Sequence, residues 1–260
     1  MRVFVAKISL ISTFLIIPQM KNLNDLWQIF LNILFPPICL SCKRCLGKND
    51  EVLCDSCRQS IPIATSFLCG SCGRRIPTIR DRLPSCACKE SCILGSVSTY
   101  GNGPINELIT ALKYRGVKNA AKPLGNLMAR FIKDSKFDPS TFIVIPVPLS
   151  YPRLRRRGYN QAELIAGEFL RALPEMPQEA RTDIIARVIN SKPQTSMSSR
   201  ELRRKNIRGA FSVINPTAIK GRCVLLIDDV FTSGATAKEA VKILKNAGAR
   251  RVIILTAARA

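Results

Sequence analysis

One short run constrains the fold of this chain more than any other part of it. The run consists of four apolar residues, two aspartates, and a loop of Thr, Ser and Gly, over Val224–Thr236. The apolar residues at 224–227 are typical of a buried parallel strand. An amphipathic helix is expected to follow over Ala235–Ala247. Such a strand–loop–helix unit predicts an α/β fold with a mainly parallel sheet flanked by helices.

The same run predicts a ligand site, because open α/β sheets bind ligands beyond the carboxyl ends of their strands. A helix N-terminus after a loop of small residues offers free backbone N–H groups and a positive dipole end, and both favour phosphate. Asp228 and Asp229 would repel a bare phosphate, but carboxylates accept hydrogen bonds from a ribose diol. The pattern therefore favours a ribose 5-phosphate. The alternative is an ordinary strand–turn–helix in which the aspartates only begin the helix.

The run resembles the 5-phosphoribosyl-1-pyrophosphate (PRPP) motif of type I phosphoribosyltransferases at almost every position. The resemblance implies that Asp228 and Asp229 bind the ribose hydroxyls, and we assign them as the candidate catalytic pair. It also implies that the following loop holds the 5-phosphate. The residues of that loop are Thr232, Ser233, Gly234, Ala235 and Thr236.

Composition limits the chemistry. The chain carries 40 Lys and Arg against 18 Asp and Glu, a formal net charge of +22. This surplus suggests polyanionic partners, meaning nucleic acid or phosphorylated ligands, although a proteome-wide bias explains the total equally well. The chain has no histidine. General acid–base chemistry must then use other side chains or solvent, and a zinc site must use thiolates or carboxylates.

The N-terminal 37 residues are expected to form an apolar, helical extension with a helix over 20–37 that ends at Pro36 and Pro37. Residues 1–19 resemble a weak signal segment but are too short and too interrupted for a confident membrane span. We favour an over-extended start at Met1, with Met20 as the natural beginning. Membrane association is the less favoured alternative.

Residues 38–94 are expected to form a small zinc-ribbon-like module, because ten of the eleven cysteines lie between Cys39 and Cys92. Two C-x-x-C turns can complete a tetrahedral zinc site. Disulfides and an iron–sulfur cluster are the alternatives, and paired spacing in a nucleotide-handling chain favours zinc in the reducing cytoplasm. Four thiolates close the shell, so the zinc would be structural. The first predicted set is Cys39, Cys42, Cys54 and Cys57, and the second is Cys69, Cys72, Cys88 and Cys92, with Cys86 as a substitute.

From residue 95 to 260 the sequence alternates between predicted strands and helices, as expected for one α/β domain. Strands are expected over 96–100, 141–145, 184–189, 223–227 and 251–256, and helices over 105–114, 120–133, 160–173, 198–206 and 235–247.

Basic clusters surround the predicted site in sequence. Arg153–Arg157 follow the strand at 141–145, and the fork of Arg157 suits phosphate oxygens. A second cluster, Arg200–Arg208, resembles a mobile flap over phosphates and could equally face nucleic acid. A third basic turn, Lys113–Gly116, carries Tyr114, which could stack on a base or simply pack. Each cluster could also be a solvated surface.

Taken together, these segments resemble the ComF family, which includes ComFC and GntX. The resemblance rests on the cysteine module and on six further motifs in order: Ala111–Gly116, Pro146–Leu149, Arg157–Gln161, Gln194–Thr195, Arg204–Phe211 and the Asp228–Asp229 run. It implies a phosphoribosyltransferase-like domain that binds PRPP with Mg²⁺, and transfer of the phosphoribosyl group to an unknown acceptor. The alternative is a competence factor that binds single-stranded DNA and works with the DNA-uptake machinery, with the PRPP site a sensor or relic.

Overall fold

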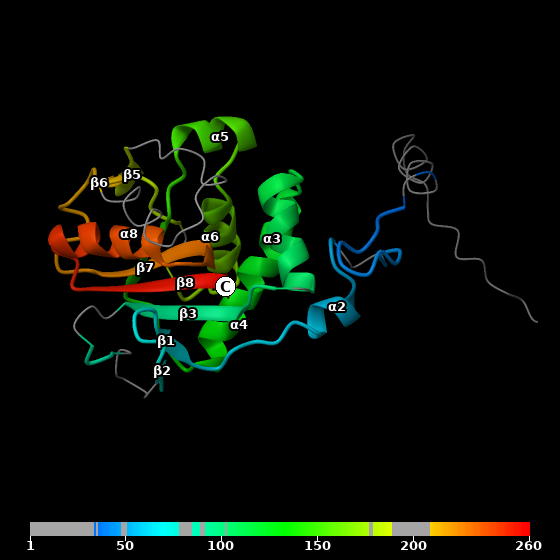
Figure 1. Cartoon of the computed structure of the whole chain (residues 1–260), viewed down its shortest axis with the longest axis horizontal. Helices are drawn as coiled ribbons and strands as arrows, with labels where there is room; N and C mark the ends of the chain where they lie inside the picture. Colours follow the sequence, from blue (N-terminus) through cyan, green and yellow to red (C-terminus); the bar gives the residue numbers. More distant parts are fainter. Residues whose placement is uncertain are drawn as a thin grey trace, which may run out of the picture. The chain divides into compact units, whose positions relative to one another are not determined.

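The computed structural model of the protein describes residues 34, 36–47, 51–77, 85–88, 92–101, 103–176, 179–188 and 209–260 (Figure 1). The chain divides into two compact units, Met1–Pro37 and Ile38–Ala260, and every element below belongs to the second. The expected helices over 20–37 and 198–206 fall almost wholly outside the described residues, as does the basic cluster Arg200–Arg208.

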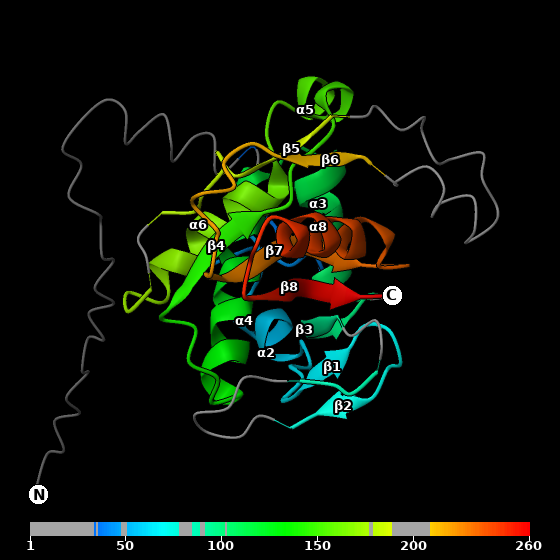
Figure 2. The ribbon, with the colours of Figure 1, turned by 90° about the vertical axis from the view of Figure 1, so that its left-hand side faces the viewer.

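Six strands of the described residues form one sheet, in the order β2-β1-β3-β8-β7-β4. Neighbours from β3 to β4 pair in parallel, whereas β1 and β2 add an antiparallel edge (Figure 2). The predicted α/β fold with a mainly parallel sheet is therefore confirmed. In sheet order the strands are β2 (Arg75–Ile76), β1 (Phe67–Cys69), β3 (Ile93–Thr99), β8 (Arg251–Arg259), β7 (Cys223–Phe231) and β4 (Phe142–Pro146).

Helices cover both faces of this sheet, which is why its strands are nearly continuous apolar runs. Successive side chains of a strand point to opposite faces. On β7, Leu225 and Ile227 join the core under three helices, while Val224 and Leu226 join the core under a fourth. The three helices are α3 (Pro104–Tyr114), α4 (Ala121–Asp134) and α6 (Gln161–Arg171), and the fourth is α8 (Ala235–Asn246).

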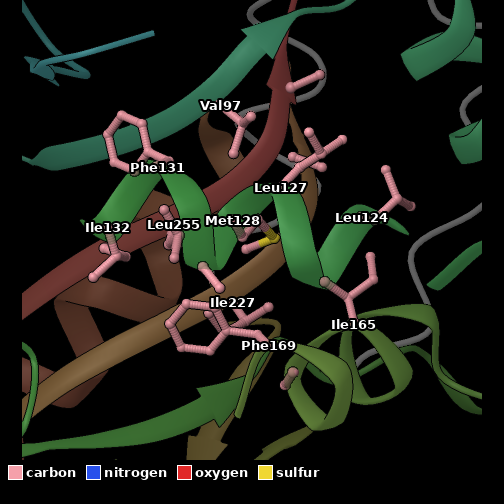
Figure 3. Packing of buried hydrophobic residues seen from close by; sticks show 14 of the residues in the cluster. Val97, Leu124, Leu127, Met128, Phe131, Ile132, Ile165, Phe169, Ile227 and Leu255 are labelled. Atoms are coloured by element: carbon pink, nitrogen blue, oxygen red, sulfur yellow. The ribbon is translucent and has the colours of Figure 1, made fainter. Parts of the chain in front are cut away.

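Helix α4 illustrates how sequence periodicity becomes packing. Its buried residues include Leu124, Met128, Phe131 and Ile132, which recur at the spacing of one helical face. Phe131 packs edge-on against Phe67 of β1, with the ring centroids 5.2 Å apart, and Figure 3 shows Phe169 of α6 in the same cluster. The short 3-10 helix η1 (Lys118–Ala120) precedes α4.

Two regions differ from the sequence-based expectation. The basic segment after β4, which is not among the expected helices, forms helix α5 (Tyr151–Arg157), with Pro152 in its first turn and Gly158 in the left-handed conformation at its end. The strand expected over 184–189 is the shorter β5 (Ile185–Arg187), and it pairs with an unexpected strand, β6 (Phe211–Val213). Strands this short show no usable alternation.

The cysteine-rich region contains two copies of one turn. In each copy the carbonyl of the first cysteine accepts a hydrogen bond from the residue four positions later, Lys43 to Cys39 at 3.0 Å and Gly73 to Cys69 at 2.8 Å. Both donor residues have positive φ, 63° and 73°. Helix α2 (Asp55–Gln59) follows the first copy. The second copy includes β1, which pairs with β3, so the main sheet continues across the expected boundary at residue 94.

In the described part of the chain, no helix combines the length and the apolar character that crossing a membrane requires.

Candidate functional site

The two aspartates lie inside β7 rather than after it. We expected the strand to end near Ile227, but it continues to Phe231. Strand β8 pairs with this extension, with Asp228 opposite Thr256, whereas the pairing with β4 ends at Ile227. The aspartates therefore lie where β7 has passed its β4 neighbour, at the carboxyl end of the parallel strands, where α/β sheets bind ligands.

Asp229 is 3% exposed and pairs with a cation from a distant element. Lys113, near the end of α3, places its Nζ 2.8 Å from Asp229 Oδ1. Burial disfavours the charged lysine, but the Asp229 carboxylate outweighs this effect and raises the pKa of Lys113. Asp229 Oδ2 is buried without a hydrogen-bond partner among the described residues. Because such an oxygen is costly to leave without a donor, it indicates a place for a ligand hydroxyl.

The neighbouring carboxyl group, that of Asp228, has a raised pKa. Burial of its carboxyl group, reinforced by the adjacent Asp229, raises the pKa of Asp228 to about 7. Its Oδ1 accepts a hydrogen bond of 2.9 Å from the backbone N–H of Asp229. The carboxyl group of Asp228 can therefore gain or lose a proton near neutrality.

Replacing Asp228 by asparagine is expected to stabilise the ligand-free protein above about pH 7. The carboxyl pKa is 3.8 without perturbation and about 7 in the folded protein. Between these values the folded state holds more protons, so wild-type stability falls as the pH rises. Asparagine keeps an oxygen for the Asp229 N–H but carries no charge. Urea unfolding should show a stability advantage that grows from about pH 4 to 7 and then levels off; an advantage independent of pH would contradict this.

The predicted phosphate loop follows β7 directly and leads into α8. Gly234 has a φ of 71° and precedes the helix, a conformation that favours glycine. Thr232 is exposed, and Ser233, Ala235 and Thr236 are half-buried. The first turn of α8 carries no acidic residue, so its N–H groups and the helix dipole favour an anion at this place.

Arg157, the predicted phosphate ligand, ends α5 and is half-buried. Its guanidinium lies 5.9 Å from the centroid of the Tyr114 ring and donates a hydrogen bond to Gln161 Oε1. Burial lowers the pKa of Arg157, while the charge of Asp229 acts in the opposite direction. The structure therefore brings Arg157 within electrostatic reach of Asp229.

The residues after Arg157 hold this region together. Tyr159 donates its hydroxyl hydrogen bond to the carbonyl of Leu112 in α3. Asn160 caps α6 by accepting from the Ala162 N–H at 3.1 Å, and its side-chain amide donates to the Val147 carbonyl at 3.1 Å. The shared segment Arg157–Gln161 thus connects α3, the end of β4 and α6, and its tyrosine and asparagine have structural roles.

Sequence reasoning missed two cations of the site. Lys113 is visible in the sequence only as part of a basic turn, and its pairing with Asp229 depends on packing between distant elements. Arg187 of β5 is the second: burial lowers its pKa, as does Arg153, while the charge of Asp228 acts in the opposite direction. Its guanidinium lies 5.4 Å from the centroid of Phe211 on β6. No local pattern signals either contact.

The cysteines form two four-thiol clusters, and in each the sulfurs all lie within 4.8 Å of one another. This spacing fits one tetrahedral zinc ion per cluster. All eleven cysteines are free of disulfides. The first cluster is the predicted set Cys39, Cys42, Cys54 and Cys57, and the second is Cys69, Cys72, Cys86 and Cys88.

The prediction that Cys92 belongs to the second set is wrong, and Cys86 takes its place. Cys92 is 4% exposed and packs in the core under α8. Burial raises the pKa of Cys92 to about 11, which disfavours the thiolate that zinc requires. Cys86 Sγ instead lies 3.7 Å from Cys72 Sγ. Cys223 is a core residue.

The first cysteine of each turn has a lowered thiol pKa, which favours metal binding. Burial opposes ionisation of Cys39, but hydrogen bonds from nearby backbone N–H groups outweigh it and lower its pKa to about 6. Cys69 has the same balance and also a pKa of about 6. Because zinc binds the thiolate, this arrangement favours metal binding at neutral pH.

Comparison with curated proteins identifies the family. Competence protein F of Haemophilus influenzae is 32% identical over 161 residues, which are 60% of this chain and 69% of that protein. The chain belongs to the ComF family. Competence protein ComFC of Bacillus subtilis is 32% identical over 156 residues, 59% of this chain and 58% of that protein. DNA utilization protein YhgH of Escherichia coli K12 is 29% identical over 153 residues, 57% of this chain and 64% of that protein.

Two domain models match this ComF-family chain. A double zinc ribbon domain matches residues 30–92, and a phosphoribosyl transferase domain matches residues 155–260. The zinc module and the phosphoribosyltransferase-like fold are thus supported by both geometry and comparison. Among solved structures, the allosteric regulatory enzyme of purine biosynthesis aligns with 57% of this chain and 30% of its own, at 19% identity and a TM-score of 0.36. That likeness carries no functional argument.

Proposed function

We propose that this ComF-family protein binds a phosphoribosyl ligand, PRPP or ribose 5-phosphate, at the carboxyl end of β7. One observation carries the proposal: Asp229 is buried, and its Oδ2 lacks a donor among the described residues. A ribose hydroxyl would supply that donor. The phosphate would lie on the N–H groups of the loop at 232–236, at the start of α8.

The cations around the site support a ligand with more than one anionic group. Arg157 and Arg187 come from different elements and lie within electrostatic reach of the acidic pair. They would hold a pyrophosphate, and Mg²⁺ would enter with the ligand, bound to its oxygens. Bound Mg²⁺ would supply positive charge that offsets part of the pyrophosphate charge. The protein would contribute position and electrostatics to transfer onto an acceptor.

Replacing Asp229 by alanine is expected to weaken ribose 5-phosphate binding by about 1.5–3 kcal/mol, the value of a lost hydrogen bond to a charged group. Calorimetric titration measures this loss. Asp134→Ala is the matched control, because Asp134 is an exposed carboxylate at the end of α4 that pairs with Arg130 at 3.5 Å. Equal affinities of the wild type and the Asp229 variant for ribose 5-phosphate would contradict the assignment of Asp229 to the ligand site.

A second function is favoured by the surface of α5. None of its residues is buried, its last turn carries Arg155, Arg156 and Arg157, and it has no acidic residue in its first turn. Tyr151 and Leu154 of this helix are 69% and 40% exposed. Arginines that alternate with exposed aromatic and apolar side chains suit single-stranded nucleic acid. The names of the relatives, competence proteins and DNA utilization proteins, point the same way. We therefore propose weak, sequence-tolerant binding of single-stranded DNA by a cytoplasmic competence factor.

The double variant Arg155→Ala, Arg156→Ala is expected to weaken the binding of single-stranded DNA equally for all sequences. It should also reduce the salt dependence of the binding affinity. Two lost phosphate contacts should reduce the slope of log affinity against log salt by about 1.4. Fluorescence anisotropy at several salt concentrations measures it. Lys242→Ala, Lys245→Ala removes equal charge from α8 and should leave the DNA slope within error. If the α5 variant loses PRPP affinity and keeps DNA affinity, these arginines serve only the pyrophosphate.

A further inference from the structure

The ring of Phe231 lies between the phosphate loop and the second cysteine cluster. Phe231 ends β7 and is 9% exposed. A Cβ placed on Gly234, at the start of α8, would lie 2.4 Å from Phe231 Cζ. A Cβ placed on Gly70, in the turn between Cys69 and Cys72, would lie 3.0 Å from the same atom. The tip of one ring therefore separates two backbone segments that are far apart in the sequence, and neither has room for a side chain.

The Gly70 side of this contact belongs to the metal turn. Gly70 directly follows Cys69, and its N–H donates to the Cys92 carbonyl at 2.7 Å. The Cys69 carbonyl accepts from Gly73 at 2.8 Å, which closes the turn. A zinc ion shared by the four sulfurs of this cluster would hold the turn in that shape. The shape of the Cys69–Cys72 turn, against which Phe231 packs, would therefore depend on the second metal site.

The Gly234 side belongs to the phosphate loop. Gly234 has a φ of 71° and directly precedes α8, and its carbonyl accepts from the Lys238 N–H at 2.8 Å. The loop has only two residues between Phe231 and Gly234, so a shift of the ring must change the path of Thr232 and Ser233. A closely packed protein core has few voids, so it transmits such a shift to the neighbouring residues.

The first cluster makes a different contact. Leu40 holds the position that corresponds to Gly70, and its N–H donates to the Val52 carbonyl at 2.9 Å, within the same cysteine-rich region. Glu51 beside it pairs with Lys122 of α4. The equivalent turn of the first cluster thus has a different hydrogen-bond partner, so substitutions in the first cluster can serve as controls for substitutions in the second.

We propose that Phe231 is a positioning residue that couples the second zinc site to the phosphate loop. While zinc closes the Cys69–Cys72 turn, the ring holds Gly234 and the start of α8 in the geometry that accepts an anion. Coupling of this kind is reciprocal, so an anion on the loop should also strengthen zinc retention at the second site. The ligand part rests on the proposed function, whereas the contact between loop and metal turn does not.

The coupling is tested first without any ligand. Cys72→Ser and Cys42→Ser remove equivalent ligands from the second and first clusters, and metal analysis should find about one zinc in each. Hydrogen exchange of the amides over 232–237 is then followed by mass spectrometry. We expect Cys72→Ser to speed this exchange about tenfold, within the usual range of coupling, and Cys42→Ser to leave it unchanged. Equal effects of the two variants, or none, would overturn the proposal.

A ligand arm separates this proposal from the proposed function. Calorimetry with ribose 5-phosphate should show about tenfold weaker binding for Cys72→Ser and unchanged binding for Cys42→Ser. If wild type fails to bind ribose 5-phosphate, the proposed function fails, and the exchange measurement still decides the coupling. If wild type binds and both variants bind equally well, the coupling fails alone.

The role of the ring itself is tested by Phe231→Leu, which keeps an apolar core side chain. We expect the variant to retain about two zinc ions and to show faster exchange over 232–237. Adding Cys72→Ser to it should cause no further increase, because the two changes break the same connection. Additive effects of the two substitutions would contradict the assigned role of Phe231.

Discussion

Replacing Lys113 by methionine is expected to lower the free energy of unfolding by about 3 kcal/mol and to weaken ribose 5-phosphate binding at least about tenfold. Lys113 Nζ lies 2.8 Å from Asp229 Oδ1, and the side chain of Asp229 is only 5% exposed. Removing one partner of a buried pair leaves an uncompensated charge, which costs about 3–5 kcal/mol. Methionine preserves the unbranched stem, so packing changes little. Urea unfolding and calorimetry measure the two effects.

The matched control is Lys122→Met on α4. Lys122 pairs with Glu51, but both side chains are about half exposed, at 51% and 43%. Exposed pairs contribute about 0–1 kcal/mol, so this variant should stay close to wild type in both assays. Equally small losses for the two variants would show that the Lys113–Asp229 pair has no special role.

Replacing Cys54 by serine is expected to remove one of about two zinc ions per chain and to unfold the first metal turn. The four sulfurs of that cluster lie within 4.8 Å of one another. A small turn of this kind has little core of its own, and the apparent binding free energy of about 10–16 kcal/mol for structural zinc in comparable peptides is also its folding free energy. Metal analysis should fall from about two zinc equivalents to one, and limited proteolysis should cleave within residues 38–59.

Cys45→Ser is the control for this experiment. Cys45 is exposed and belongs to neither cluster. The variant should keep both zinc ions and resist proteolysis as wild type does. A Cys54 variant that retains the full metal content would refute the assignment of the first cluster. Iron and visible absorption in the wild-type protein would show that the cysteines bind an iron–sulfur cluster instead of zinc.

The local parts of this protein are determined by its sequence. The run at 224–236 predicts the central strand, the acidic pair and the helix that follows, because hydrophobic periodicity and helix-start chemistry act over a few residues. The Cys39–Cys57 set is equally local, since C-x-x-C turns place their own thiolates. Resemblance to the ComF family added the order of the motifs, and comparison confirms the family.

Tertiary structure decided which of several similar residues act together. The sequence-based prediction preferred Cys92 and kept Cys86 as a substitute, but Cys92 lies in the core under α8, and Cys86 completes the cluster. Spacing cannot distinguish them because burial depends on the whole sheet.

Packing between distant segments likewise determines which residues meet at the carboxyl end of the parallel strands. Lys113 reaches Asp229 because α3 and β7 belong to one core, and Phe231 meets Gly70 because β1 joins the sheet through β3. Contacts between segments so far apart leave no periodic signal, since each depends on loop closure and packing of the intervening chain. The sequence alone therefore determines the strand, the acidic pair, the loop, the first metal turn and three ligands of the second metal set. Only the tertiary structure supplies the contacts of Lys113 and Phe231 and selects Cys86 as the fourth ligand.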